Sequence, residues 1–180
     1  PSADEIVIEL DPGAAFGTGA HATTAMCLRW LEHLVSPGMR VYDVGCGSGI
    51  LAVAAAKLGA GEVIAMDYDP VAVSVAEENI RQNNVHNVVA CESDLLSACE
   101  GAAPAELITA NIIADVIIRL FAQLDRHLAL GGTLLASGII DDRIADVEHA
   151  AAQHGFTVLD MTCEKEWAAM IIRRATDIKN

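Results

Sequence analysis

The amino-acid sequence predicts an α/β domain in which a mostly parallel sheet is covered by helices on both faces. Apolar runs of strand length alternate regularly with longer amphipathic stretches along the 180 residues. Hydrophobic residues make up 53% of the chain and aromatic residues only 4%. Ala, Val, Ile and Leu must therefore fill the core, as in a sheet that is buried on both faces. The length corresponds to a single domain.

The periodicity places each element in order. We predict strands at Arg40–Val44, Glu62–Asp67, Val88–Glu92, Glu106–Asn111, Thr133–Ser137, Thr157–Met161 and Trp167–Arg173, and helices at Ala22–Leu34, Ile50–Leu58, Val71–Asn83, Ala114–His127 and Asp142–His154. Pro70 suits the first turn of a helix, and Asp69 before it is a natural N-cap. The five residues Thr162–Glu166 are too few for a parallel crossover, so the last two strands should form an antiparallel hairpin.

Composition restricts the classes of function. The net charge of −14 disfavours direct binding of nucleic acid, which needs clustered Lys and Arg. It suits a basic protein partner, although solubility alone would also explain it. Five cysteines without a C-x-x-C pair indicate neither a disulfide framework nor a metal site, and favour the cytoplasm. The longest uncharged stretch, Pro12–Leu28, is too short and too rich in glycine to cross a membrane.

The strongest motif is a glycine-rich turn between a strand and a helix. It reads Val41-Tyr42-Asp43-Val44-Gly45-Cys46-Gly47-Ser48-Gly49, with the helix beginning at Ile50. Glycine allows a sharp turn and close approach to a ligand, and exposed N–H groups there favour an anionic group. Gly45 and Gly47 are thus candidate ligand contacts. Dinucleotide enzymes use G-x-G-x-x-G, whereas D-x-G-x-G-x-G resembles the first motif of S-adenosylmethionine-dependent methyltransferases.

Three polar residues follow strands whose carboxyl ends should meet near this turn. Asp67 ends the second strand and could accept both ribose hydroxyls of a nucleoside, although it could also be a plain turn residue. Asp94 could accept from an adenine amino group or serve only in a turn. Asn111 ends the fourth strand, where its amide could meet a substrate amine or cap the next helix.

A segment upstream carries a resemblance to one family. Leu10–Thr24 reads Leu-Asp-Pro-Gly-Ala-Ala-Phe-Gly-Thr-Gly-Ala-His-Ala-Thr-Thr. It resembles the loop L-D-P-G-x-A-F-G-T-G-x-H-x-T-T of the PrmA family, which methylates ribosomal protein L11. Gly45–Leu51, Asn111–Ala114 and Glu166-Trp167 match the family as well, so the resemblance covers nearly the whole chain. Ala20 and Ala22 depart from it, since the family often has Thr and Pro there.

The resemblance implies a Rossmann-like methyltransferase fold, a seven-stranded mostly parallel sheet ending in an antiparallel hairpin. It implies S-adenosylmethionine as cofactor and N-methylation of lysine or α-amino groups on a basic ribosomal protein in the bacterial cytoplasm. Thr24, Gly45, Asp67 and Asn111 would contact the cofactor, and Phe16–Gly19 would cover its methionine end. Family members also carry an N-terminal domain that holds the substrate. We expect residues 1–180 to be the catalytic domain alone, either part of a longer protein or a short relative with another target.

The sequence does not assign the catalytic residues. His21 is the nearest candidate base, although it could instead cap a helix. Ile112-Ile113-Ala114 replaces the Pro-Pro-aromatic sequence that clamps a nucleobase in planar-nitrogen methyltransferases, which favours an aliphatic amine and disfavours nucleic acid. Three competing functions are methylation of a different protein or a small amine, cofactor binding without catalysis, and nicotinamide-dependent oxidoreduction.

Overall fold

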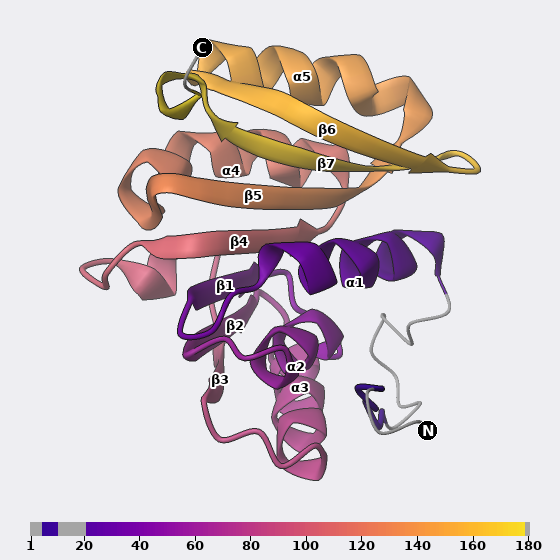
Figure 1. The fold of residues 1–180 in the computed structure, drawn as a ribbon, viewed down its shortest axis with the longest axis vertical. Coiled ribbons are helices and arrows are strands. Elements are labelled where there is room, and N and C mark those ends of the chain that lie inside the picture. The colour runs from indigo at the N-terminus through magenta and orange to yellow at the C-terminus, as the bar shows by residue number, and fades with distance from the viewer. Residues whose placement is uncertain (1–4, 11–20, 179–180) are drawn as a thin grey trace.

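Seven strands form one sheet in the order β3-β2-β1-β4-β5-β7-β6 (Figure 1). The computed structural model describes residues 5–10 and 21–178. Neighbouring strands from β3 to β5 are parallel, whereas β7 runs antiparallel to both β5 and β6. The strands are β1 (Arg40–Val44), β2 (Glu62–Asp67), β3 (Val88–Glu92), β4 (Ala105–Asn111), β5 (Leu128–Ile140), β6 (Phe156–Glu164) and β7 (Trp167–Arg174). The helices are α1 (Ala22–Leu34), α2 (Ile50–Lys57), α3 (Pro70–Gln82), α4 (Ala114–His127) and α5 (Ile144–Gln153), with short 3-10 helices η1 (Ser97–Cys99), η2 (Asp141–Arg143) and η3 (Ala175–Asp177).

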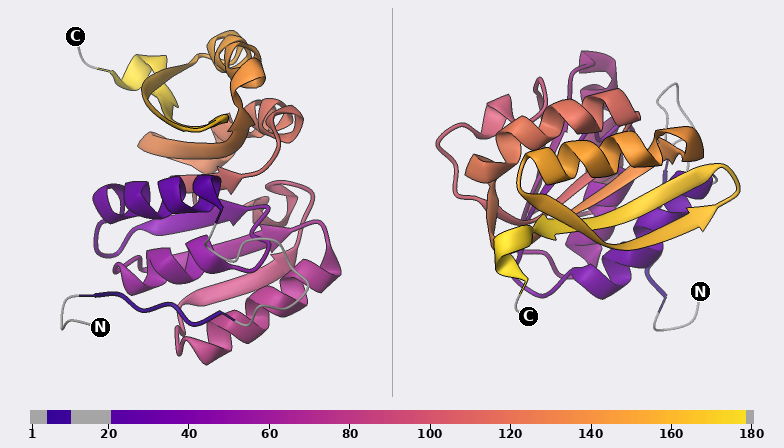
Figure 2. Two further views of the ribbon diagram at one scale, coloured as in Figure 1. Left: turned by 90° about the vertical axis from the view of Figure 1, so that its right-hand side faces the viewer. Right: turned by 90° about the horizontal axis from the view of Figure 1, so that it is seen from above.

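Helices cover both faces of the sheet, as predicted. Figure 2 shows α4 and α5 stacked on one side, and the core divides accordingly. Successive residues of a strand point to opposite faces. Tyr42 and Val44 of β1 therefore pack with the α4–α5 side, while Val41 packs with α1, α2 and α3. Each face thus has its own apolar layer.

The helices form where the sequence supplies an apolar stripe and a start signal. In α4, Ile117, Leu120, Phe121 and Leu124 are buried at a spacing of three, one and three residues, which is one face of a helix. α3 begins at Pro70, and the Asp69 carboxylate accepts from the Val71 N–H at 2.9 Å, so the predicted cap is confirmed. Within the described ranges, no helix is long and apolar enough to cross a membrane.

Several elements of the C-terminal half differ from the predicted bounds, and the largest differences are in β5 and β6. β5 starts at Leu128, directly after α4, instead of at Thr133. Gly131 has a φ of 73°, and the pairing with β4 shifts register nearby, which hides this strand start from a periodicity argument. The hairpin is antiparallel as expected, but its turn is shorter. β6 runs on to Glu164, and Lys165 takes up the turn with a φ of 56°.

The order of the strands leaves a crevice between β1 and β4. From β1 the chain continues to β2 and β3 on one side, and β4 is followed by β5 on the other. The connecting helices α2 and α4 lie on opposite faces of the sheet. Ligands of open parallel sheets bind at such a switch point, beyond the carboxyl ends of the strands. Val44, Asp67 and Asn111 end β1, β2 and β4 at this edge.

Gly138 lines one wall of the crevice, and a side chain there would be crowded by Ile112. It lies at an irregularity of β5 with a φ of 80°, and a Cβ there would come within 2.5 Å of the Ile112 carbonyl oxygen. Gly38 has a similar φ of 84° but open space around it. The two positions therefore separate backbone strain from crowding.

We expect Gly38→Ala to lower the free energy of unfolding by about 1 kcal/mol, the cost of a left-handed residue with a side chain. Gly138→Ala should lower the free energy of unfolding by about 3 kcal/mol, because overpacking against Ile112 adds to the same backbone strain. Urea unfolding of both variants measures the difference. Equal losses would show that the close contact with Ile112 relaxes freely.

Candidate functional site

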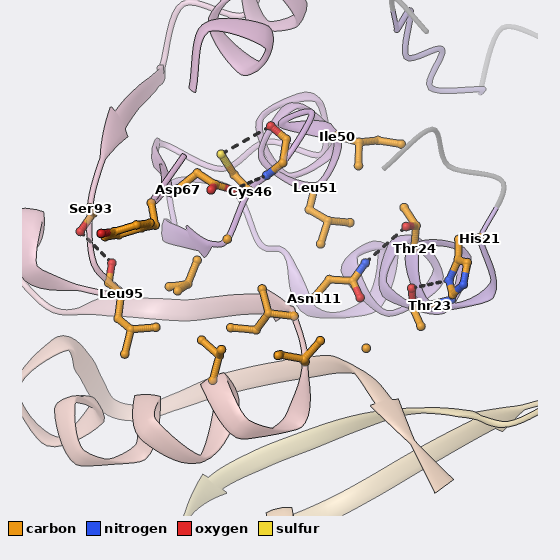
Figure 3. Close-up of a pocket in the computed structure, with 18 of the residues that line it drawn as sticks. His21, Thr23, Thr24, Cys46, Ile50, Leu51, Asp67, Ser93, Leu95 and Asn111 are labelled. Carbon is orange, nitrogen blue, oxygen red and sulfur yellow. Dashed lines mark hydrogen bonds between the residues drawn. The ribbon is translucent and has the colours of Figure 1, made fainter. Parts of the chain in front are cut away.

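A cavity of about 970 Å³ opens at the carboxyl ends of β1, β2 and β4 (Figure 3). This volume lies at the upper end of the range for small-molecule sites. The glycine turn forms one wall, and the start of α1 and the beginning of α4 form others. The lining residues are His21, Thr23, Thr24, Val44, Gly45, Cys46, Gly47, Ile50, Leu51, Asp67, Tyr68, Ser93, Asp94, Leu95, Asn111, Ile112, Ile113, Val116, Arg119, Gly138 and Trp167.

The glycine turn is closely packed, and its first glycine has no room for a side chain. Gly45, Gly47 and Gly49 all have positive φ, and a Cβ on Gly45 would overlap the Ile112 side chain. The N–H groups of Gly45 and Cys46 both donate to the Met66 carbonyl, at 2.8 and 2.9 Å, and that of Gly49 donates to Cys46. The N–H of Gly47 donates to Asp67. The prediction that the turn offers free N–H groups to an anion is therefore wrong for these four, because they stabilise the turn itself.

Asp67 joins the glycine turn to the end of β2. Its Oδ2 accepts from the Gly47 N–H at 2.9 Å and its Oδ1 accepts from the Asp69 N–H at 3.0 Å. The residue is half-buried, and it lines the cavity. A carboxylate has about four lone-pair sites. Two of them are used inside the protein, so acceptor capacity remains for a ligand.

Asn111 and Thr24 meet across 87 positions of sequence. The Asn111 Nδ2 donates to the Thr24 Oγ1 at 3.3 Å (Figure 3). The idea that Asn111 caps α4 is wrong, because Ile113 occupies that position without a side-chain cap. The side-chain oxygen Oδ1 of Asn111 therefore keeps acceptor capacity beside the cavity. β4 and α1 together position this amide.

His21 lines the cavity and also caps a helix. It is the N-cap of α1, where its ring nitrogen Nδ1 accepts from the Thr23 N–H at 3.4 Å and lies 2.8 Å from the Thr23 Oγ1. Its ring also packs edge-on against Trp167, with centroids 5.1 Å apart. The pair connects α1 to the β6–β7 hairpin at the cavity wall.

Asp94 follows β3 at the far end of the cavity and pairs with Arg119 of α4 at 3.3 Å. The next residue, Leu95, is 7% exposed and holds a φ of 55°, which is unusual for a side chain of this size. Ser93 stabilises this turn, because its Oγ donates to the Leu95 carbonyl at 2.8 Å and accepts from the Ala98 N–H at 3.0 Å. The turn thereby presents Asp94 and Leu95 to the cavity.

Two buried groups, Asp43 in β1 and Cys46 within the turn, determine the electrostatics around the turn. Asp43 is fully buried, and burial raises its pKa to about 6 although a hydrogen bond from Thr109 lowers it. Among the described residues, none donates a hydrogen bond to its Oδ2. Burial, and then the charges of Asp43 and Asp67, raise the pKa of the Cys46 thiol. Cys46 therefore stays a neutral thiol at the cavity wall, which excludes a thiolate nucleophile there.

Comparison with known proteins decides the family. The sequence profile described as ribosomal protein L11 methyltransferase (PrmA) matches residues 1–175. The chain belongs to this family. Its resemblance to PrmA proteins, first seen in the upstream loop, is confirmed.

Individual relatives agree with the family match. Ribosomal protein L11 methyltransferase of Caldanaerobacter subterraneus is 51% identical over 97% of this chain and 55% of its own length. That of Heliobacterium modesticaldum is 49% identical over 97% and 55%. The crystal structure of the ribosomal protein L11 methylase of Lactobacillus delbrueckii has a TM-score of 0.88 at 37% identity, covering 95% of this chain and 86% of that one. The chain therefore has the methyltransferase fold, and it spans about half the length of the curated relatives it matches.

The structure of this PrmA-family chain brings the predicted residues Thr24, Gly45, Gly47, Asp67, Asp94 and Asn111 to one cavity. The predicted cover Phe16–Gly19 lies outside the described residues. Sequence reasoning missed Ser93, Leu95 and Arg119, which have no motif of their own. For Trp167 the only signal was the family-like ending Glu166-Trp167.

The raised pKa of Asp43 predicts that the stability of this chain depends on pH. A carboxyl whose pKa is raised to about 6 by folding binds its proton more tightly in the folded state. Its contribution to stability therefore grows as the pH falls through 6 toward the unfolded value near 3.9. Asn at this position does not titrate.

We compare the free energy of unfolding of Asp43→Asn with that of the wild type at each pH. When the pH falls from 7.5 to 5, the wild type should gain about 1 kcal/mol relative to the variant. Urea unfolding of both proteins at the two pH values measures this difference, in which the remaining carboxylates cancel. A difference independent of pH would mean that Asp43 titrates normally.

Proposed function

We propose that this chain binds S-adenosylmethionine in the cavity and transfers its methyl group to amine nitrogens of ribosomal protein L11. The observation that carries the proposal is the Asp67 carboxylate, which faces the cavity while it is anchored to the Gly47 and Asp69 N–H groups. A fixed carboxylate with spare acceptor capacity suits the two hydroxyls of a ribose.

The remaining wall residues fit the other parts of this cofactor. Asp94 and Leu95 lie where an adenine would reach beyond the ribose, with Asp94 able to accept from its amino group. Gly45 lines the cavity with its backbone, since contact with Ile112 leaves no room for a Cβ, and Thr24 and Asn111 lie toward the amino-acid end. The cavity volume of about 970 Å³ leaves room for a substrate side chain as well.

The charge of the cavity argues against a nicotinamide dinucleotide. A pyrophosphate needs free backbone N–H groups or basic side chains. Here the turn N–H groups of Gly45, Cys46, Gly47 and Gly49 have protein acceptors. Of the Lys and Arg side chains in the described part of the chain, only Arg119 lines the cavity, and it pairs with Asp94. Asp67 and Asp94 instead suit a cationic ligand.

When bound, S-adenosylmethionine supplies a methyl group on a positively charged sulfur. The protein's own residues then have to hold and align the amine. A free lysine has a pKa near 10.4, so only about one in a thousand is neutral at pH 7.4. Ile112 and Ile113 at the cavity wall help to desolvate the ammonium, which lowers its pKa. The Asn111 carbonyl oxygen can accept from an N–H of the amine, while Thr24 fixes the amide.

The substrate proposal rests on the family and on charge. The curated relatives are named for methylation of ribosomal protein L11. The net charge of −14 favours approach of a basic ribosomal protein over direct contact with nucleic acid. Five free cysteines support the cytoplasm as the compartment.

Asp67→Ala should weaken binding of S-adenosylhomocysteine roughly tenfold or more, the scale of lost charge-assisted hydrogen bonds. Isothermal titration calorimetry measures this. Asp69→Asn is the matched control, since it removes a charge two residues away but keeps a good helix cap. Its affinity should stay within about twofold of wild type. Unchanged affinity in Asp67→Ala would remove this carboxylate from the site.

Asn111→Ala should lower the rate of methyl transfer to ribosomal protein L11 roughly a hundredfold, because the amine loses its alignment. Incorporation of labelled methyl at saturating cofactor gives this rate. Affinity for S-adenosylhomocysteine should fall much less. Absence of transfer by the wild type, despite tight cofactor binding, would favour a non-catalytic module or another substrate.

A further inference from the structure

Residues 5–10, the N-terminal strip, lie along α2 and α3. Figure 2 shows this indigo segment beside these helices. Ile8 and Leu10 pack against the apolar layer that contains α2 and α3. The Lys57 Nζ also donates to the Val7 carbonyl at 2.6 Å. The strip is thus attached by packing and by hydrogen bonds.

One side chain holds the centre of the strip. Asn83, the C-cap of α3, accepts from the Glu9 N–H at 3.0 Å through Oδ1 and donates to the Glu9 carbonyl at 2.6 Å through Nδ2. This amide pairs with both polar groups of one residue, as a neighbouring strand would. Asn83 is 8% exposed, so loss of either bond would leave a buried polar group unsatisfied.

Further hydrogen bonds lead from Asn83 through Asn79 to the glycine turn. The Asn83 Nδ2 also donates to the backbone carbonyl of Asn79 at 2.8 Å. The side chain of Asn79 in turn donates through Nδ2 to the backbone carbonyl of Ser48 at 2.8 Å. Asn79 is fully buried and Ser48 is 4% exposed. Ser48 follows Gly47, whose N–H donates to Asp67. These hydrogen bonds, together with the covalent structure of Asn79 and the peptide bond between Gly47 and Ser48, therefore connect the strip to the carboxylate at the cavity.

We propose that Asn83 is a positioning residue that couples attachment of the N-terminal strip to occupation of the cofactor cavity. Asn83 is not among the described residues that line the cavity; it acts through Asn79 on the carbonyl at Ser48. Buried amide networks have few alternative arrangements, so a shift at one end changes the free energy at the other. By linkage, a ligand that favours the native turn stabilises the attached strip, and the attached strip strengthens ligand binding by the same factor. The coupling rests on the proposed function, because the ligand is the proposed cofactor.

Two substitutions break the path from opposite sides. Asn83→Ala removes the side chain that holds the strip. Glu9→Pro removes the N–H that donates to Asn83, together with the Glu9 carboxylate, and fixes the local φ, but it leaves the amides of Asn83 and Asn79 in place. Asn87→Ala is the matched control, because it also removes an amide bonded to a backbone carbonyl, that of Ala60 at 2.6 Å, but away from the strip.

Calorimetric titration of the full chain with S-adenosylhomocysteine should show roughly fivefold weaker binding for Asn83→Ala and for Glu9→Pro, the lower end of typical coupling. Asn87→Ala should bind like wild type. Hydrogen–deuterium exchange adds a reading that a purely structural role would not change. The ligand should slow exchange at residues 5–10 in wild type, and it should have no such effect in Asn83→Ala.

Wild-type affinity in both variants, or an equal loss in Asn87→Ala, would overturn the coupling while leaving the cofactor proposal intact. The coupling would also be overturned if the ligand left the exchange rate at residues 5–10 of the wild type unchanged. A wild-type chain that fails to bind S-adenosylhomocysteine would overturn both the coupling and the proposed function.

Discussion

The location of the site depends on one constraint, the reversal of strand order between β1 and β4. Connections between parallel strands are right-handed, so chains that leave neighbouring strands in opposite directions must place their helices on opposite faces. Here α2 and α4 diverge in this way, and no described helix or strand covers the strand ends between them. The glycine turn after β1 and Asn111 after β4 flank this gap. The remaining features of the site refine a crevice that topology already provides.

Asp67 gives the crevice its chemical character. It anchors the turn through Gly47 and the start of α3 through Asp69, so the carboxylate is fixed before any ligand arrives. The turn consequently uses its N–H groups internally and offers little to an anion. Buried Asp43 beneath it adds negative potential. A nucleoside with a positive centre fits these charges better than a dinucleotide does, and a neutral Cys46 leaves direct transfer to an amine as the simpler chemistry.

Sequence reasoning worked where structure is local. β1, β2, β3, α1 and α4 have the predicted bounds, because the periods of strands and helices are encoded within a few residues. The start of α3 was also predictable to within one residue, from the cap at Asp69 and the proline at position 70. Candidate residues at strand ends were predictable too, since parallel strands end at a common edge. Contacts between distant segments were not predictable. The bond between Asn111 and Thr24, the pairing of Asp94 with Arg119 and the hold of Asn83 on Glu9 depend on tertiary packing. The partners of the turn N–H groups were unpredictable for the same reason, because their acceptors lie partly on β2.

The central claim is that one nucleoside lies across the strand ends with its sugar on Asp67. A crystal structure of the chain with S-adenosylhomocysteine tests this most directly. We predict both ribose hydroxyls within hydrogen-bonding distance of the Asp67 carboxylate and the adenine against Leu95. A ligand bound elsewhere, or a crevice filled by the protein's own side chains at saturating ligand, would contradict the account.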